Sequence, residues 1–249
     1  DGIVTATGTG KTYIKVYNQG TGAHAAVKVN VNGTQGKVYP KITAGGNFFA
    51  ALKANGEIWT WGYNGYGQLG TTDKTSKLKP TKTNIYDSSD NTQKVYAIDV
   101  ASGNNNTVVL KSDGTVWATG YNGYGQLGNG NTSNLYVPTE VMELENIVDV
   151  AVENNTIIAL DSKGQVYSSG YNGYGNLGDN TTNGRNKFGK VIESIEEETK
   201  EPTYLSNVKQ IEAGNETAIA IKKDGTAVAW GYNGYGQLSN GNTTNALLA

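Results

Sequence analysis

The sequence has no cysteine, a single histidine and only four prolines among its 249 residues. Without cysteine, the chain cannot form a disulfide scaffold, a thiolate nucleophile or a cysteine-ligated zinc site. No apolar run reaches the roughly 20 residues that a membrane-spanning helix needs, so we expect no membrane insertion. The net charge of −2 lacks the basic excess that is typical of proteins bound to nucleic acid, and we expect no nucleic-acid partner.

The first residue is Asp1, and no charged segment followed by an apolar one comes after it. We therefore expect a mature or excised piece of a longer polypeptide. Glycine, by contrast, is abundant at 34 residues, and asparagine, threonine and tyrosine are conspicuous. This composition favours strands joined by tight turns over helices. The one stretch with a weak helical spacing, residues 191–200, is expected to be a loop with at most one helical turn.

One ten-residue phrase occurs four times with little change. Its copies are WGYNGYGQLG at 61–70, TGYNGYGQLG at 119–128, SGYNGYGNLG at 169–178 and WGYNGYGQLS at 230–239. Six residues before the first glycine of each phrase stands another glycine, preceded by Asn55, Asp113, Lys163 or Asp224. This pair predicts a two-residue hairpin turn with positive φ at both positions. Apolar residues at period two before and after the turn predict a half-buried strand on each side.

The repeating unit is longer than the phrase. From Gly62 to Gly120, Gly170 and Gly231 the intervals are 58, 50 and 61 residues. Units of this length with about four short strands are typical of β-propeller blades, which cannot bury their apolar faces without neighbours. The remaining strands are predicted around residues 99–105, 148–154 and 208–215. The sequence therefore predicts an all-β fold with about four blades.

The order of these features resembles the repeat of the regulator of chromosome condensation family. An Ala-x-Gly segment, an apolar strand, Asp-Gly, a Trp-bearing strand and Gly-x-Asn-x-x-Gly-Gln-Leu-Gly follow one another from about residue 42 to 249. The resemblance implies a seven-bladed propeller, of which this chain would supply about four blades. A position that is often histidine in that family is here Phe48, Asn106, Thr156 and Thr217, so any role of those histidines is absent.

Residues 1–33 have a different pattern, with alternating strands after a Gly-x-Val-Thr-Ala start. They resemble the closing strands of a bacterial group 2 Ig-like domain. We therefore predict two domains: the C-terminal strands of an Ig-like β-sandwich at 1–33, and propeller repeats, incomplete at the C-terminus, at 34–249. The segment GTGKT at 8–12 ends like a phosphate-binding loop. No nucleotide site is predicted, because Thr5 replaces the required glycine and a strand pattern follows.

The two tyrosines of each phrase are the candidate ligand-binding residues. They are Tyr63, Tyr66, Tyr121, Tyr124, Tyr171, Tyr174, Tyr232 and Tyr235. They form either a ring of aromatic faces suited to sugars or peptides, or packing between blades. We expect packing, with most of the eight buried, because aromatic residues in a regular repeat usually belong to the core.

The other residues of the phrase are explained by geometry. Glycine at fixed offsets indicates backbone positions with positive φ or a close approach to a neighbouring blade. The asparagine at the fourth position and the glutamine or asparagine at the eighth are expected to satisfy buried backbone groups. The leucine at the ninth position is expected to anchor the phrase in the core.

Catalysis has little support in the sequence. His24 lies in the Ig-like segment, so the propeller contains no histidine to act as a general base. The acidic runs at 196–198 and 87–90 are interpreted as solvated loop charges, and neither has metal-loop spacing. We expect no catalytic residue, no metal and no cofactor.

We expect a non-catalytic binding, adhesion or structural module of a large bacterial extracellular or cell-surface protein. Its protein or glycan ligand would be held by the loops between blades, above all 71–94 and 179–207, since long loops on a rigid scaffold usually carry binding. One alternative, implied by eukaryotic members of the family, is guanine-nucleotide exchange on a small GTPase. Another is a carbohydrate-active propeller, which would need two carboxylates at one cleft.

The last unit is predicted to be cut, because residues 243–249 end where 131–141 of the second unit supply a further strand. An open array of blades exposes apolar faces and strand edges. We therefore expect that further sequence or a second copy of the chain completes the ring, with self-association through the open edges as the alternative to a longer polypeptide.

Overall fold

The computed structural model describes residues 10–17, 24–31, 38–83, 95–141 and 143–249. It divides into two compact units, Asp1–Lys37 and Val38–Ala249. In the first unit, β1 (Gly10–Tyr17) pairs antiparallel with β2 (His24–Val31), from Gly10 opposite Val31 to Tyr17 opposite His24. The end of the GTGKT segment thus lies in a strand, as the sequence predicts. Its assignment to an Ig-like domain stays a prediction.

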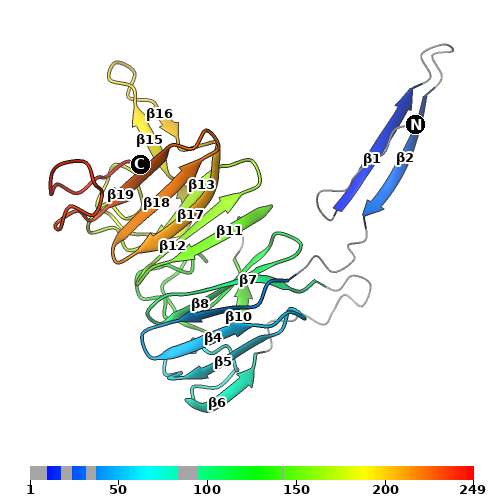
Figure 1. Cartoon of the computed structure of the whole chain (residues 1–249). Helices are drawn as coiled ribbons and strands as arrows, with labels where there is room; N and C mark the ends of the chain where they lie inside the picture. The colour runs from blue at the N-terminus through cyan, green and yellow to red at the C-terminus, as the bar shows by residue number, and fades with distance from the viewer. Residues whose placement is uncertain (1–9, 18–23, 32–37, 84–94, 142) are drawn as a thin grey trace. The chain divides into compact units, whose positions relative to one another are not determined.

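The second unit is built of antiparallel sheets whose strands follow one another in chain order (Figure 1). We call its four main sheets the first to fourth blades. Their strands are β3 (Lys41–Ala44), β4 (Phe48–Leu52), β5 (Ile58–Gly62) and β6 (Lys77–Lys82); β7 (Ala97–Ser102), β8 (Asn106–Lys111), β9 (Val116–Gly120) and β10 (Leu135–Glu140); β11 (Ile147–Val152), β12 (Thr156–Asp161), β13 (Val166–Gly170) and β14 (Arg185–Lys190); β17 (Val208–Gly214), β18 (Thr217–Lys222) and β19 (Ala227–Gly231).

The strands predicted around 99–105, 148–154 and 208–215 are confirmed as β7, β11 and β17. In the fourth blade, the place of a fourth strand is marked by a bridge between Gly231 and Ala246. The all-β prediction is confirmed, since no helix occurs among the described residues. No membrane-spanning helix is found among the described residues. The seven-bladed ring stays a prediction.

The hairpin turn between the second and third strands of each blade differs from the predicted two-residue turn. In the second blade, the Gly114 N–H donates to the Lys111 carbonyl and the Lys111 N–H donates to the Thr115 carbonyl, both at 2.9 Å. These bonds close a three-residue loop in which Gly114, with φ +83°, takes the left-handed conformation. Asp113 does not need positive φ, because only the last residue of such a loop is left-handed; its carboxylate also accepts the Thr115 N–H.

The apolar cores lie between blades. One buried cluster joins the first and second blades through side chains such as Ala50, Val100 and Val109, and two further clusters join the second to the third and the third to the fourth blade. Every residue of β8 and β12 is buried, because these strands have a neighbouring blade on each face. A blade therefore has no core of its own.

Large apolar side chains are exposed on the first and fourth blades. Phe49 in β4 and Ile219 in β18 are exposed, whereas the corresponding residues of β8 and β12 are buried. Phe49 stacks on Trp61 with ring centroids 5.5 Å apart. These faces agree with the idea of an open array, and self-association through them stays a prediction.

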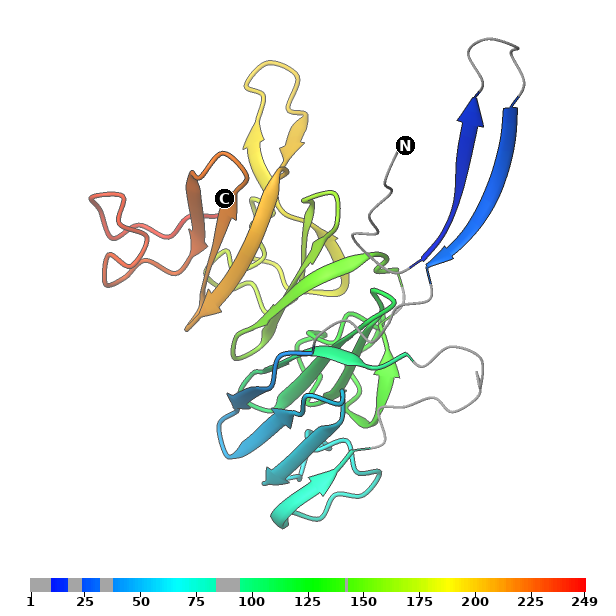
Figure 2. The same cartoon turned by 45° about the vertical axis from the view of Figure 1, so that its right-hand side comes forward.

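Residues 191–200 contain a strand rather than the predicted loop with one helical turn. β15 (Ile192–Ile195) pairs antiparallel with β16 (Pro202–Tyr204) in a hairpin that projects from the third blade (Figure 2). Val191 and Leu205 at its base are buried, in the places that Val141 and Leu144 fill after the second blade. The hairpin therefore accounts for the eleven additional residues of the third interval, since 205 minus 191 exceeds 144 minus 141 by that number.

This correspondence makes the hairpin removable. Replacing residues 192–204 by Met-Glu, the pair found at 142–143, keeps both anchoring side chains. Besides the hairpin, it removes the Glu193–Lys222 ion pair and the backbone bonds between Ile192 and Gly178 and between Ile192 and Ala249. We expect the melting temperature to change by no more than about 4 °C, equivalent to about 1 kcal/mol in a chain of this size. The measurement is a thermal unfolding curve of the variant, compared with that of the parent chain. A drop of 10 °C or more would show that the hairpin is part of the fold rather than an addition to it.

Candidate binding surface

Each phrase folds around its buried asparagine. The carboxamide oxygen of Asn122 accepts the Leu127 N–H at 2.9 Å. Its nitrogen donates to the Asn129 side chain and to the carbonyls of Asn131 and Ser133, at 3.0–3.1 Å. Equivalent bonds are made by Asn64, Asn172 and Asn233. The predicted role of these asparagines is confirmed.

The eighth position of the phrase holds its turn and links it to the next blade. Gln126 accepts the Tyr124 N–H at 3.1 Å and donates to Asn155 of the third blade at 3.4 Å. The leucine that follows is fully buried in the first three phrases, as predicted. In the fourth phrase, Leu238 is only half-buried.

The glycine between the two tyrosines makes room for the first of them. The hydroxyl of Tyr121 lies over Gly123, so that a Cβ on this glycine would overlap it. The backbone of Gly123 does not have positive φ, and the need for glycine here comes from the tyrosine alone. The same overlap occurs in all four phrases. Consequently the first tyrosine is held flat against the turn.

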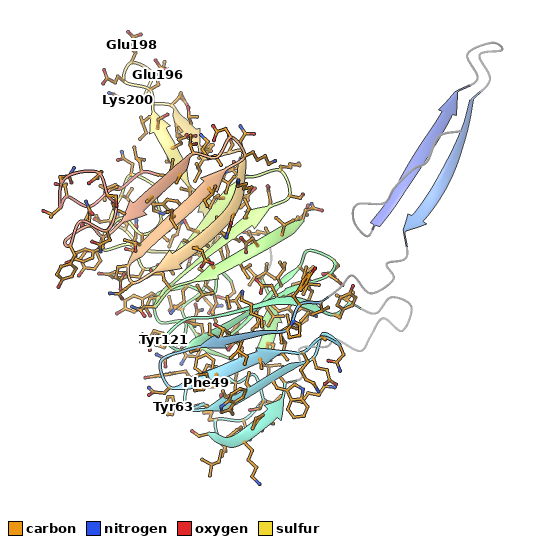
Figure 3. The ribbon with its side chains drawn as sticks, in the orientation of Figure 1. Phe49, Tyr63, Tyr121, Glu196, Glu198 and Lys200 are labelled. Carbon is orange, nitrogen blue, oxygen red and sulfur yellow. The ribbon has the colours of Figure 1, made fainter. Side chains whose placement is uncertain are left out.

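The eight tyrosines form one continuous row. Adjacent ring centroids are 5.9, 5.2, 6.1, 5.3, 6.0, 4.9 and 6.0 Å apart from Tyr63 to Tyr235, and the rings cross at 54–83°. The second tyrosine of each phrase contacts the first tyrosine of the next, so the row passes from blade to blade. Tyr63 and Tyr121 lie along the same side of the blades (Figure 3). We call these eight residues the tyrosine row.

The prediction that most of these tyrosines are buried is wrong. Tyr63, Tyr124, Tyr174 and Tyr235 are 42%, 47%, 38% and 89% exposed, and the other four are half-buried. Packing between blades does occur, but it joins neighbouring rings at the surface. The interior of each turn is already filled by its asparagine and leucine, and the tyrosines therefore lie outside it.

Two hydroxyls of the row, those of Tyr121 and Tyr171, have raised pKa values. Burial raises the pKa of Tyr121 above its ordinary value, and the neighbouring Tyr124 and Tyr66 add to the rise. The pKa of Tyr171 is raised in the same way, by burial first and then by Tyr174. At neutral pH these groups are hydrogen-bond donors and acceptors on aromatic rings.

Two carboxylates lie beside Tyr171, where the third and fourth blades meet, and no motif in the sequence indicates them. Glu153 is 5% exposed; it accepts the Glu216 N–H at 2.7 Å and an N–H of the Asn176 side chain at 3.1 Å. Asn176 also donates to the Glu216 carboxylate at 2.7 Å. Burial, and then the charge of Glu216, raise the pKa of Glu153 to about 7.

A signal for this cluster exists in the repeats. Where the previous blades have Gly103, Gln126 and Asn155, the chain has Glu153, Asn176 and Glu216. The shorter Asn176 and the longer Glu216 together preserve the inter-blade bond that Gln126 makes to Asn155. Comparing equivalent positions across units, rather than searching each unit for motifs, would have found the three substitutions together.

The inner strands meet around a hollow of about 220 Å³. Each blade contributes a residue from the turn after its inner strand: Gly46, Asn104, Asn154 and Asn215. The Asn154 side chain donates to Asn215 at 2.7 Å, and the Gly46 N–H donates to the Asn104 carbonyl at 2.9 Å. The lining includes the polar side chains of Ser102 and Glu153, and the buried Ser102 hydroxyl has no hydrogen-bond partner among the described residues.

The acidic run at 196–198 lies away from the row. Glu196 and Glu198 are exposed at the tip of the β15–β16 hairpin, near Lys200, as predicted for solvated charges (Figure 3). Residues 87–90 lie outside the described residues, as does the side chain of His24. Within the described part of the chain, no three His, Cys, Asp or Glu side chains are grouped so as to hold a metal ion.

Two models of the regulator of chromosome condensation (RCC1) repeat match the chain. One matches residues 55–110 and 113–160, and the other 41–68, 97–126 and 208–237. The human E3 ubiquitin-protein ligase HERC2 is 30% identical over 211 residues, which are 83% of this chain and 4% of HERC2. The probable human E3 ubiquitin-protein ligase HERC4 is 35% identical over 106 residues, 43% of this chain and 10% of HERC4.

Solved structures give the same fold. Prp20p from Saccharomyces cerevisiae has a TM-score of 0.62 and 25% identity, over 84% of this chain and 50% of Prp20p. Human WBSCR16 has a TM-score of 0.69 and 20% identity, over 89% of this chain and 54% of that protein. The chain thus spans about half of these solved chains and a small part of the two ligases. It carries repeats of the RCC1 family, folded like the blades of an RCC1 propeller.

Proposed function

We propose that the chain is a non-catalytic binding module that holds an extended ligand along the tyrosine row. The observation that supports this proposal is that eight tyrosines from four blades contact one another in a row and remain partly exposed to solvent. Rings of this kind offer an apolar face together with a polar hydroxyl, which is why tyrosine is enriched at recognition surfaces. An exposed aromatic band of this length is also uncommon on a surface without a partner.

The proposed ligand is a protein segment or a glycan, bound by the phrases between the third and fourth strands of each blade. A protein partner is supported by Prp20p, which binds Gsp1p and histones. The same likeness favours a second candidate, nucleotide exchange on a small GTPase. That candidate predicts faster release of a fluorescent guanine nucleotide from a GTPase when the chain is added.

We further propose that the module belongs to a bacterial extracellular or cell-surface protein, where an Ig-like stalk presents it. The support is the resemblance of residues 1–33 to the end of such a domain. The long loop at 179–207 is then secondary for binding, because its additional residues form the β15–β16 hairpin rather than part of the row.

The row is tested by removing exposed rings. Tyr124→Ala with Tyr174→Ala interrupts the row at two places without emptying a core position, so the fold is expected to remain intact. We expect at least a tenfold loss of binding to any oligosaccharide or peptide that the parent chain captures on an array, since each lost stacking contact is worth about 0.5–1.5 kcal/mol. Tyr39→Ala, which removes an exposed tyrosine outside the row, is the matched control. Unchanged capture by the double variant would refute the proposed surface.

A further inference from the structure

The tyrosine row is notched rather than flat. Within the phrases the two rings cross at 71–83°, and between the first three phrases at 65–71°. Each of these six pairs therefore places the face of one ring against the edge of the next. A flat sugar stacks best on coplanar faces, whereas a notch of this shape fits a compact apolar ring such as that of proline.

The repeat of the row limits the conformation of a matching chain. The steps from Tyr63 to Tyr66 and from Tyr66 to Tyr121 are 5.9 and 5.2 Å, so equivalent rings of neighbouring blades are no more than about 11 Å apart. A polyproline II helix rises about 3.1 Å per residue with three residues per turn, and repeats every 9 Å or so. In an extended strand, side chains on one face recur after about 7 Å, which lies further below this limit than the polyproline II repeat does.

The polar groups fit the same ligand. A polyproline II segment makes no internal hydrogen bonds, so its carbonyl oxygens are free to accept. The tyrosine hydroxyls can donate to them, because a phenol is protonated at neutral pH. The ligand is also extended before it binds, which lowers the conformational entropy lost on a surface without deep pockets.

We propose that the tyrosine row binds a proline-rich peptide segment in the polyproline II conformation, with prolines of successive turns in the notches of successive blades. This inference rests on the proposed function of the row as a binding surface. Four blades span three repeats, so a segment of about ten to twelve residues fills the row.

The test uses the 249-residue chain and three fluorescent probes: an all-proline peptide of about twelve residues, one of six, and a Gly-Ser peptide of the longer length. We expect the longer proline peptide to bind at least tenfold more tightly than the shorter one, because it reaches more blades, and the Gly-Ser peptide not to bind. Tyr124→Ala should lower the affinity for the longer peptide at least fivefold, and Tyr39→Ala should leave this affinity unchanged.

Gly123→Ala provides a second variant that keeps every tyrosine. Its new methyl group displaces the Tyr121 hydroxyl without backbone strain. The variant should therefore bind the longer peptide more weakly, while its melting temperature stays nearly unchanged. Cellohexaose and chitohexaose form the glycan arm. Glycan binding that Tyr124→Ala abolishes, with no binding of proline peptides, overturns this inference and retains the proposed function. Proline-peptide binding that neither variant changes overturns both.

Discussion

Asn122→Ala is expected to destabilise the chain by about 3 kcal/mol. The asparagine is fully buried, and its carboxamide joins Leu127, Asn129, Asn131 and Ser133. Alanine leaves the buried Leu127 N–H without its acceptor, which costs about 1–3 kcal/mol, and it removes the donor to the carbonyls of Asn131 and Ser133 in a more exposed loop. The melting temperature should fall by about 10 °C, as measured by differential scanning calorimetry.

Asn129→Ala is the matched control for this substitution. It removes one of the same bonds from a partly exposed residue and should cost no more than about 1 kcal/mol. If Asn122→Ala were no more damaging than Asn129→Ala, the asparagine would not organise the phrase. The tyrosine row would then need another explanation for its regular spacing.

Glu153 should make stability depend on pH. Its pKa is raised from the ordinary 4.5 to about 7 in the folded chain, first by burial and then by Glu216. The folded protein binds this proton more tightly than the unfolded chain does. The stability linked to it is therefore fully present below pH 4.5 and is lost as the pH rises through 7. The total loss corresponds to about 3 kcal/mol.

Two variants isolate this effect. Glu153→Gln removes the titrating group and should flatten the fall in melting temperature between pH 5 and pH 8. Glu216→Gln removes the neighbouring charge but keeps an acceptor for Asn176, and should raise the melting temperature at pH 8 while leaving it unchanged at pH 4. Glu196→Gln, at the exposed hairpin tip, should follow the parent at every pH. A parent-like pH profile in both of the first two variants would contradict the assignment.

Much of the fold could be predicted from local pattern. Strands such as β8 and β12 follow from apolar period two next to an Asp-Gly or Lys-Gly turn, and the buried asparagine follows from its place among glycines. The turn type could not be predicted from the residue pair, because Asp113-Gly114 and Lys163-Gly164 occupy the same three-residue loop. The β15–β16 hairpin was missed because β16 has only three residues and β15 carries no alternating pattern.

The candidate site was less accessible from the sequence. Its residues were named correctly, but their exposure was not, because a repeat period places Tyr121 and Tyr124 in the turn without saying which side of it they occupy. The cluster of Glu153, Asn176 and Glu216 depends on contacts between residues 23 to 63 positions apart. No local window contains such contacts.

The placement of the apolar cores between blades has a thermodynamic consequence. Folding a single blade orders its backbone but buries little apolar surface, so the free energy of folding one blade alone is unfavourable. Folding becomes favourable only when a neighbouring blade packs against it. The chain should therefore behave as a one-dimensional cooperative array, in which the second and third blades are stabilised from both sides and the outer two from one. Unfolding of this chain then proceeds from the outer blades inward, and each blade that unfolds breaks one interface between blades.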